Sequence, residues 1–359
     1  MSTQTTTQPH GLVHVDRIKV LLPCIHKALG NDKWEFTAGD TGEIRQAANG
    51  QSGSLEYHES KYYVHSKKVQ PCGVALELEL DICPPKLIQR HNVFGHSNLV
   101  RYVVQGMEKL LVQAPHFKHV VIRPEDIAEW ARGNFRVYGV HLTANYHCPR
   151  DQVLHIINAI DTHNSSGKHR NIATSISLGY SGNQRSALRT GTVYDKYLER
   201  QSAWKAPGPI RQQLLNYIRD SVRVEIKLFS ANLKKLGLDI GAAWLGRDVD
   251  ALYFSELERL NLWTAAQPTL NAHELSSLKD TQRNAYIAWL HGTPFDSLFD
   301  TRQTGAKHAA AILKAVGVNI KQPVRPKHLM GINTAEVFTA EKILSIPDWL
   351  RDSEFFISD

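Results

Sequence analysis

Two tyrosines stand three residues apart in the segment Thr192–Arg200, where Lys196 and Glu199 accompany Tyr194 and Tyr197. A phenol has an ordinary pKa of about 10, so only about one in a thousand is ionised at pH 7. It becomes a nucleophile for phosphorus when a cation, a base or a metal ion assists it. Lys196 is suited to lower the pKa of a phenol or to hold a phosphate. Tyrosines at this spacing also serve as packing residues, so the segment by itself leaves both interpretations open.

Carboxylates and one imidazole lie on the polar sides of three alternating stretches. They are Glu79 between Glu77 and Asp81, then His141, then Glu225. If the stretches are strands of one antiparallel sheet, their polar faces share one side of it. Carboxylate oxygens with one imidazole suit Mg²⁺ or Mn²⁺. The plainer interpretation is that these residues face solvent on ordinary strands.

A third candidate is the block Gln89–Gly95, which reads Gln-Arg-His-Asn-Val-Phe-Gly. Its Asn and Gly favour a turn, and its Arg and His are suited to a phosphate. The block therefore predicts either a loop that meets a phosphate through its backbone amides or simply a tight turn.

The elements that position these residues follow from hydrophobic periodicity. Period-two alternation predicts strands, and spacing of three to four residues predicts helices. Strands are expected at 13–22, 61–65, 73–82, 135–146 and 221–229, and helices at 97–113, 124–132, 150–164, 209–219, 271–292 and 304–317. Asn271 with Glu274 forms a capping-box pattern at the start of one helix, and Gly317 ends the last.

This order of elements predicts an α+β fold, with a central antiparallel sheet covered by helices and a helical C-terminal part. We expect a flexible tail at 1–11, a sheet-based domain at 12–230 and a helical region at 231–359 that is a candidate for DNA binding. A helix such as Thr304–Gly317 either enters a major groove or packs against its neighbours.

The composition excludes several classes of protein. The chain has 359 residues, of which 42% are hydrophobic, which is too many for a disordered chain. It has no apolar run of about 18 to 20 residues that would span a bilayer. The four cysteines show no CxxC spacing, which indicates reduced thiols and no zinc site. With 42 basic and 35 acidic residues, the net charge of +7 is modest, and we expect basic surface to be spread around the acidic site.

Together, three blocks resemble the replication initiators of filamentous phages, the gene II class. Pro84–Gly95 is similar to that family's Pro-x-Lys-x-x-Gln-x-His-Asn-Val-Phe-Gly block, and Tyr194, Lys196 and Glu199 match its Tyr-x-Lys-x-x-Glu element. Arg223 and Glu225 match its Arg-x-Glu strand. The blocks keep the family's order over roughly residues 75 to 240, and the His-Asn-Val-Phe-Gly block is the specific one.

The resemblance implies a rolling-circle nuclease fold and a phage plus-strand origin as substrate. Tyr194 would attack one phosphodiester, keep the 5′ phosphate as a phosphotyrosyl bond, leave a 3′ hydroxyl and later rejoin the displaced strand. Lys196, Tyr197 and Glu199 complete the expected catalytic set, and Mg²⁺ or Mn²⁺ is expected at Glu79, His141 and Glu225. At His141 the better-known members of the family carry Asp. The DNA contacts are expected from Lys86, Arg90, His91, Asn92, Arg223 and Lys227.

The expected partners are double-stranded origin DNA, the displaced single strand, a host helicase and a DNA polymerase, with a homodimer as a further expectation and the cytoplasm of a bacterial host as the location. Two alternatives remain open. A plasmid rolling-circle initiator or relaxase would use the same chemistry. A non-catalytic origin-binding regulator would keep the sheet and lose cleavage.

Overall fold

The computed structural model describes residues 12–29, 37–38, 44–45, 50–55, 60–118, 120–163, 169–172, 174–179, 189–260, 270–321 and 334–357. The tail expected at 1–11 lies outside these residues. The chain forms two compact units whose segments alternate along the sequence. Unit 1 comprises Met1–Thr143, Lys227–Tyr253 and Ser345–Asp359, and unit 2 comprises Ala144–Ile226 and Phe254–Leu344.

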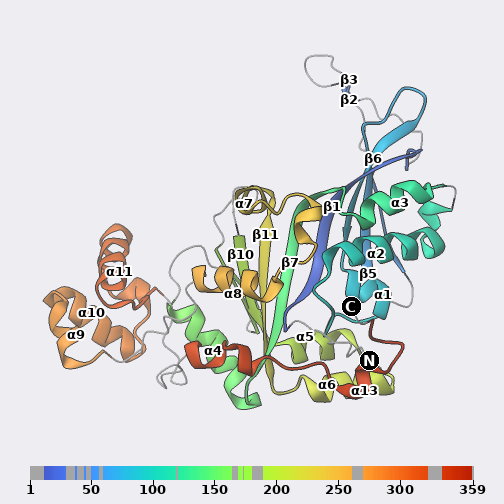
Figure 1. Cartoon of the computed structure of the whole chain (residues 1–359). Coiled ribbons are helices and arrows are strands. Elements are labelled where there is room, and N and C mark those ends of the chain that lie inside the picture. The colour runs from blue at the N-terminus through green and yellow to red at the C-terminus, as the bar shows by residue number, and fades with distance from the viewer. Residues whose placement is uncertain are drawn as a thin grey trace. The chain divides into compact units, whose positions relative to one another are not determined.

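Nine strands hydrogen-bond into one sheet in the order β4-β5-β6-β1-β7-β11-β10-β9-β8 (Figure 1). Their bounds are β1 His14–Lys27, β4 Gly50–Leu55, β5 Ser60–Lys67, β6 Val74–Ile82, β7 Arg136–His147, β8 His169–Ile172, β9 Ser175–Leu178, β10 Arg189–Tyr194 and β11 Ser221–Phe229. A separate pair, β2 Thr37–Ala38 and β3 Ile44–Arg45, is also antiparallel. The neighbours β4–β5, β5–β6, β6–β1, β1–β7, β10–β9 and β9–β8 all run antiparallel. The predicted α+β class with a central antiparallel sheet is confirmed.

In unit 1 the strand β6 shows how tertiary pairing modifies an alternating pattern. Leu78, Leu80 and Ile82 are fully buried, as alternation predicts. Leu76, however, is exposed, whereas the neighbouring Ala75 is buried. The pairing of β1 with β6 shifts register at this point, and such an irregularity turns the following side chains to the opposite face.

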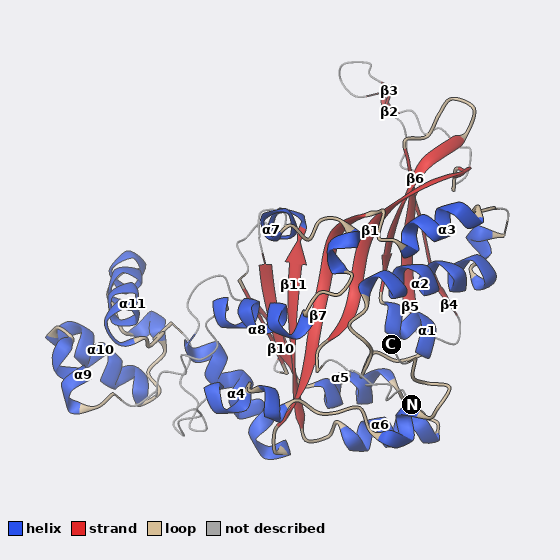
Figure 2. Ribbon diagram, in the orientation of Figure 1, coloured by secondary structure: helices blue, strands red, loops and turns tan. Residues whose placement is uncertain are grey.

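Helices α1 (Pro84–Gln89), α2 (Leu99–Gln113) and α3 (Pro124–Ala131) pack with one another and with β1 (Figure 2). The Asn98 side chain caps α2 by accepting a hydrogen bond from the Arg101 N–H at 3.0 Å. The apolar stripe of this helix, including Leu99, Val103 and Met107, is almost completely buried. The expected helix at 97–113 is therefore confirmed and covers the sheet, as an amphipathic helix does.

The remaining helices follow the predictions with shifted bounds. They are α4 Arg150–His163, α5 Lys196–Ala203, α6 Pro209–Tyr217, α7 Ser230–Leu236, α8 Val249–Arg259, α9 Ala272–Ser277, α10 Asp280–Leu290, α11 Arg302–Val316, α12 Thr334–Val337 and α13 Asp348–Arg351, with short 3₁₀ turns at Pro115–Phe117, Gly241–Trp244, Phe295–Ser297 and Ala340–Lys342. The capping box at Asn271 is present, but the single helix expected at 271–292 is broken at Leu278 into α9 and α10.

The expected boundary near residue 230 stays a prediction about independently folding domains. By contacts, α7 and α13 belong to unit 1, whereas α9 to α11 belong to unit 2. Within the described residues, no helix combines the length and the apolar character needed to cross a bilayer.

Candidate functional site

In unit 2 the candidate tyrosine lies where β10 ends and α5 begins. Tyr194 is the last residue of the strand and is half-buried, with Ser175 of β9 as its neighbour across the ladder. The next residue, Asp195, has extended backbone angles and accepts a hydrogen bond from the Leu198 N–H at 3.0 Å. An aspartate in this position satisfies an otherwise unpaired amide at the helix start, so Asp195 fixes where the strand stops and the helix begins.

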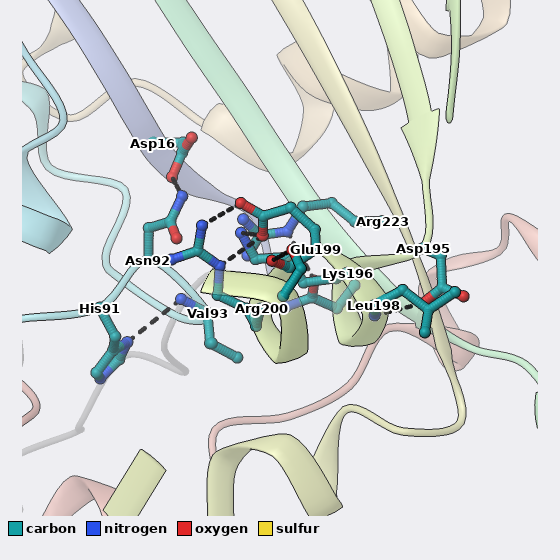
Figure 3. Close-up of polar contacts among 12 residues, drawn as sticks. Asp16, His91, Asn92, Val93, Asp195, Lys196, Leu198, Glu199, Arg200 and Arg223 are labelled. Atoms are coloured by element: carbon teal, nitrogen blue, oxygen red, sulfur yellow. Dashed lines mark hydrogen bonds and ion pairs between the residues drawn. The ribbon is translucent and has the colours of Figure 1, made fainter. Parts of the chain in front are cut away.

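The first turn of α5 carries a compact cluster of charges, drawn in Figure 3. The Lys196 ammonium is completely buried and lies 2.9 Å from Glu199 Oε2. Arg200, also nearly buried, donates from Nε and Nη2 to the same carboxylate. Burial opposes ionisation of Glu199, but the charge of Lys196 and the hydrogen bond from Arg200 outweigh it and hold its pKa well below the usual range. Glu199 is therefore ionised at neutral pH and anchors both cations.

The two candidate tyrosines have different surroundings. The Lys196 ammonium lies 5.7 Å from the centre of the Tyr194 ring, and the charge state of Tyr194 contributes to the raised pKa of Arg200. Tyr197 instead lies under the Arg150 guanidinium, at 5.0 Å from its ring centre, and its hydroxyl accepts a hydrogen bond from Gln201 at 3.0 Å. Only Tyr194 is thus placed beside the buried ammonium.

Arg150, the first residue of α4, holds the start of α5 in place, and sequence reasoning missed it. Its two terminal nitrogens lie 3.0 and 2.5 Å from the two oxygens of Asp195, whose side chain is completely buried. It also donates to the backbone carbonyl of Arg219 at 3.3 Å. Hydrogen bonding to Asp195 is the main cause that raises the pKa of Arg150. No local pattern reveals this pair, because its members are 45 positions apart in the sequence.

Arg223 of β11 lies inside unit 2. Its side chain is completely buried, and its Nε donates to Asn145 Oδ1 at 2.8 Å. Its positive charge acts on Arg200 and works against the raised pKa of that residue, which places the two guanidinium groups near each other. Glu225, two residues further along β11, is also buried. The alternating pattern predicted the strand, but it did not predict that the polar side would be buried as well.

In unit 1 the acidic strand β6 is matched by cations from both neighbouring strands. Glu79 lies 3.1 Å from Lys19 of β1 and 3.5 Å from Lys67 of β5. Asp81 similarly contacts Arg17 at 2.7 Å. Lys67 also lies 2.9 Å from Nδ1 of His65, which pairs with Glu79 across the ladder. Burial lowers the pKa of His65, and the charge of Lys67 lowers it further.

The metal ligands expected from the sequence are placed as follows. Glu79 is buried between the two lysines, His141 is half-buried on β7 and Glu225 is buried on β11. Among the described residues, no group of three or more His, Cys, Asp or Glu side chains is arranged to hold a metal ion. The donors as they lie therefore do not fit a three-ligand site, and the expected Mg²⁺ or Mn²⁺ stays a prediction from the sequence.

The Gln89–Gly95 block forms a turn held by the chain itself. Helix α1 ends at Arg90, whose φ of 68° is left-handed. His91 is buried, with Nε2 2.7 Å from the carbonyl oxygen of Phe355. Asn92 is buried and donates to Asp16 Oδ1 at 2.8 Å. Of the four DNA contacts expected here, Arg90 is exposed and Lys86 half-exposed, whereas His91 and Asn92 point into unit 1.

The C-terminal segment contributes to this block in a way that sequence reasoning also missed. The Arg90 guanidinium lies 5.4 Å from the centre of the Phe355 ring and 4.0 Å from Glu354. The N–H of Ile357 donates to Gln89 at 3.3 Å. These partners lie at opposite ends of the sequence, so only the tertiary structure identifies them. Lys227, the last of the expected DNA contacts, is half-exposed on β11.

The chain matches the N-terminal family model of the phage replication-associated proteins of the gene II type over residues 15–247. The match covers more than half of the chain and includes all three sequence blocks. The chain belongs to this family, in agreement with the gene II resemblance. It is also similar to the replication-associated protein of the same type from Enterobacteria phage I2-2, with 21% identity over 323 residues that cover 85% of this chain and 87% of that protein. No solved structure matches it significantly.

Proposed function

We propose that the protein initiates rolling-circle replication of a phage by cutting one strand of the plus-strand origin through Tyr194. The observation that carries the proposal is the position of Tyr194 beside the completely buried Lys196 ammonium, 5.7 Å from the ring centre. Membership of the gene II type family and the similarity to a phage replication-associated protein support it. The similarity to a phage protein also favours a phage over a plasmid origin.

The local charges supply what a phenol needs. A neighbouring cation favours the charged form of an ionisable group, so Lys196 stabilises a Tyr194 phenolate. A completely buried ammonium is not screened by solvent, which strengthens this effect relative to a surface lysine. Arg200, which is close enough for Tyr194 to affect its pKa, adds positive charge near the reacting oxygen. Such preorganised charge also stabilises the developing negative charge of a phosphoryl transition state.

In the proposed reaction the Tyr194 oxygen forms a bond to phosphorus as the bond from phosphorus to the 3′ oxygen breaks. The phenol loses its proton, and the departing 3′ oxygen gains one to become the free hydroxyl. The 5′ phosphate stays on Tyr194, and attack by a 3′ hydroxyl reverses the step and rejoins a strand. Because the phosphotyrosyl bond conserves the energy of the broken phosphodiester, joining needs no ATP.

Glu199 is a positioning residue in this proposal. A carboxylate whose pKa is held well below its usual range is a poor proton acceptor at neutral pH. Its contacts go to Lys196 and Arg200, so it fixes the two cations relative to Tyr194. A requirement for Mg²⁺ or Mn²⁺ at Glu79, His141 and Glu225 remains a separate proposal that rests on the sequence, and no step above uses the ion.

The partners in this proposal are duplex origin DNA, the displaced single strand, a host helicase and a DNA polymerase, in the cytoplasm of a bacterial host. A homodimer is also proposed. A non-catalytic origin-binding regulator is the second candidate function. It is favoured only if the wild-type protein binds the origin and leaves it intact.

The test compares Tyr194→Phe with the matched control Tyr197→Phe on supercoiled phage DNA. We expect Tyr194→Phe to abolish both nicking and the covalent adduct between protein and DNA, with DNA binding retained. Tyr197→Phe should keep both activities, because its ring lies under Arg150 rather than beside Lys196. The opposite result for the two variants would show that the nucleophile is Tyr197. Mapping the DNA-linked peptide checks the same assignment directly.

A further inference from the structure

The positive charge of the chain is concentrated in one stretch, contrary to the expectation that it is spread around the acidic site. Residues 301–335 contain six Lys or Arg and no Asp or Glu. The other 324 residues contain 36 basic and 35 acidic side chains, and so are nearly neutral in sum. Almost the entire net charge of +7 thus lies in this stretch. A local cluster of this kind is typical of a surface that binds a polyanion.

The described part of this stretch is mostly the helix α11, Arg302–Val316. Thr301 caps its start by accepting from the Thr304 N–H at 3.2 Å, and Gly317 ends it in a left-handed conformation. One face, formed by Gly305, Ala309 and Ile312, is buried. This face belongs to a core shared with α10, whose largest members are Tyr286 and Trp289. The helix is therefore held rigidly by one side only.

The opposite face of α11 is exposed and has a regular composition. Gln303, Lys307, Ala310 and Lys314 are all exposed and recur at intervals of four, three and four residues, which places them in one line along the helix. We call these four residues the α11 stripe. At about 1.5 Å per residue the stripe is roughly 16 Å long. The helix contains no acidic residue that would repel a phosphate.

We propose that the α11 stripe enters the major groove of duplex DNA and reads base edges there. The major groove is about 12 Å wide and admits a helix. A glutamine bonds an adenine edge, a lysine bonds guanine, and an alanine contacts the methyl group of thymine, so three members of the stripe are side chains that discriminate between bases. Lys314, towards the C-terminal end of the helix, is suited to a phosphate.

The composition of the stripe favours a duplex over other polyanions. Proteins that bind single strands stack bases on aromatic side chains, and the stripe contains none. An anionic membrane surface would require large apolar residues beside the lysines, and the stripe has only Ala310. The inference rests on the proposed function only for the identity of the DNA, because the stripe belongs to a surface separate in sequence from Tyr194 and its charges.

The experiment measures binding of the full chain to labelled duplex fragments that tile phage replicative-form DNA, at several salt concentrations. The variants are Gln303→Ala with Lys307→Gln, and Lys314→Gln alone. Lys109→Gln, a half-exposed lysine of α2, is the matched control for loss of one positive charge. Cleavage of a single-stranded oligonucleotide carrying the nicking site is measured in parallel, because it reports on Tyr194 without requiring duplex recognition.

We expect the double variant to lose at least about tenfold in affinity for the fragment that the wild type prefers, since base contacts of this kind contribute about 1–3 kcal/mol each, or about five- to 150-fold. Lys314→Gln should weaken binding to all fragments and reduce the slope of log affinity against log salt by about 0.9. Lys109→Gln and single-strand cleavage should stay at wild-type levels.

Wild-type affinity and salt slope in the stripe variants would overturn the inference. An equal loss in Lys109→Gln, or a parallel loss of single-strand cleavage, would also overturn it, because the effect would then be general. Failure of the proposed function is distinguishable. If the wild type never nicks but binds one fragment preferentially, the nicking proposal falls, and the comparison of affinities still decides the role of the stripe.

Discussion

The ion pair between Arg150 and Asp195 predicts how firmly the nucleophile is held. Asp195 has no exposed side-chain surface, whereas 26% of the Arg150 side chain is exposed. Removing one member of a buried pair costs about 3–5 kcal/mol, because the other charge loses its partner. Since Arg150 keeps some access to water, we expect the lower limit of that range. Asp195→Asn should therefore destabilise the β10–α5 junction by about 3 kcal/mol, although asparagine still caps the helix.

Hydrogen exchange of the peptide that contains the Leu198 amide is the appropriate assay, because it reports local opening in a chain of two units. A loss of about 3 kcal/mol corresponds to exchange that is about a hundredfold faster. Asp195→Ala should add about 1 kcal/mol, since it also removes the cap that Leu198 donates to. The control is Asp151→Asn, an exposed acid next to Arg150, which should change exchange only slightly.

A double-mutant cycle with Arg150→Met separates the pair from other effects. If the two residues stabilise the junction through each other, the effects of the single variants will not add, and the coupling will be at least about 1 kcal/mol. Exchange within a few fold of wild type in Asp195→Asn, together with additive effects in the cycle, would refute the reasoning. The start of α5 would then be held by its cap and its packing alone.

Two further predictions concern pH and metal. Burial and the charge of Arg101 lower the pKa of His96 to about 3, and its ring stacks on Tyr102 at 3.6 Å. Because the unfolded chain takes up this proton near pH 6.5, the free energy of unfolding should fall by about 1.4 kcal/mol per pH unit between about 6 and 3, and His96→Gln should flatten that part of a denaturation profile. For the predicted ion, a chelator should stop nicking and added Mg²⁺ or Mn²⁺ should restore it; full activity in chelator would remove the metal proposal, and Glu79 would then be held by Lys19 and Lys67 alone.

The elements of the fold could be predicted from the sequence because they depend on local patterns. The alternation in β6 and β11, the capping box at Asn271 and the terminal Gly317 each identify an element without knowledge of its neighbours. The short Tyr194–Glu199 block likewise fits within one helical turn and the end of a strand, so its members meet whatever the rest of the chain does. Their spacing already implied the contact between Lys196 and Glu199.

The tertiary structure alone decided which of these residues are buried and what they contact. It placed lysines from β1 and β5 on Glu79, brought Arg150 to Asp195 and laid Phe355 against His91. Each of these contacts joins residues from different elements of the fold, and strand pairing and packing set them rather than local propensity. The sequence by itself therefore determined the chemistry that is present and the elements that carry it, whereas long-range pairing determined which charges face one another.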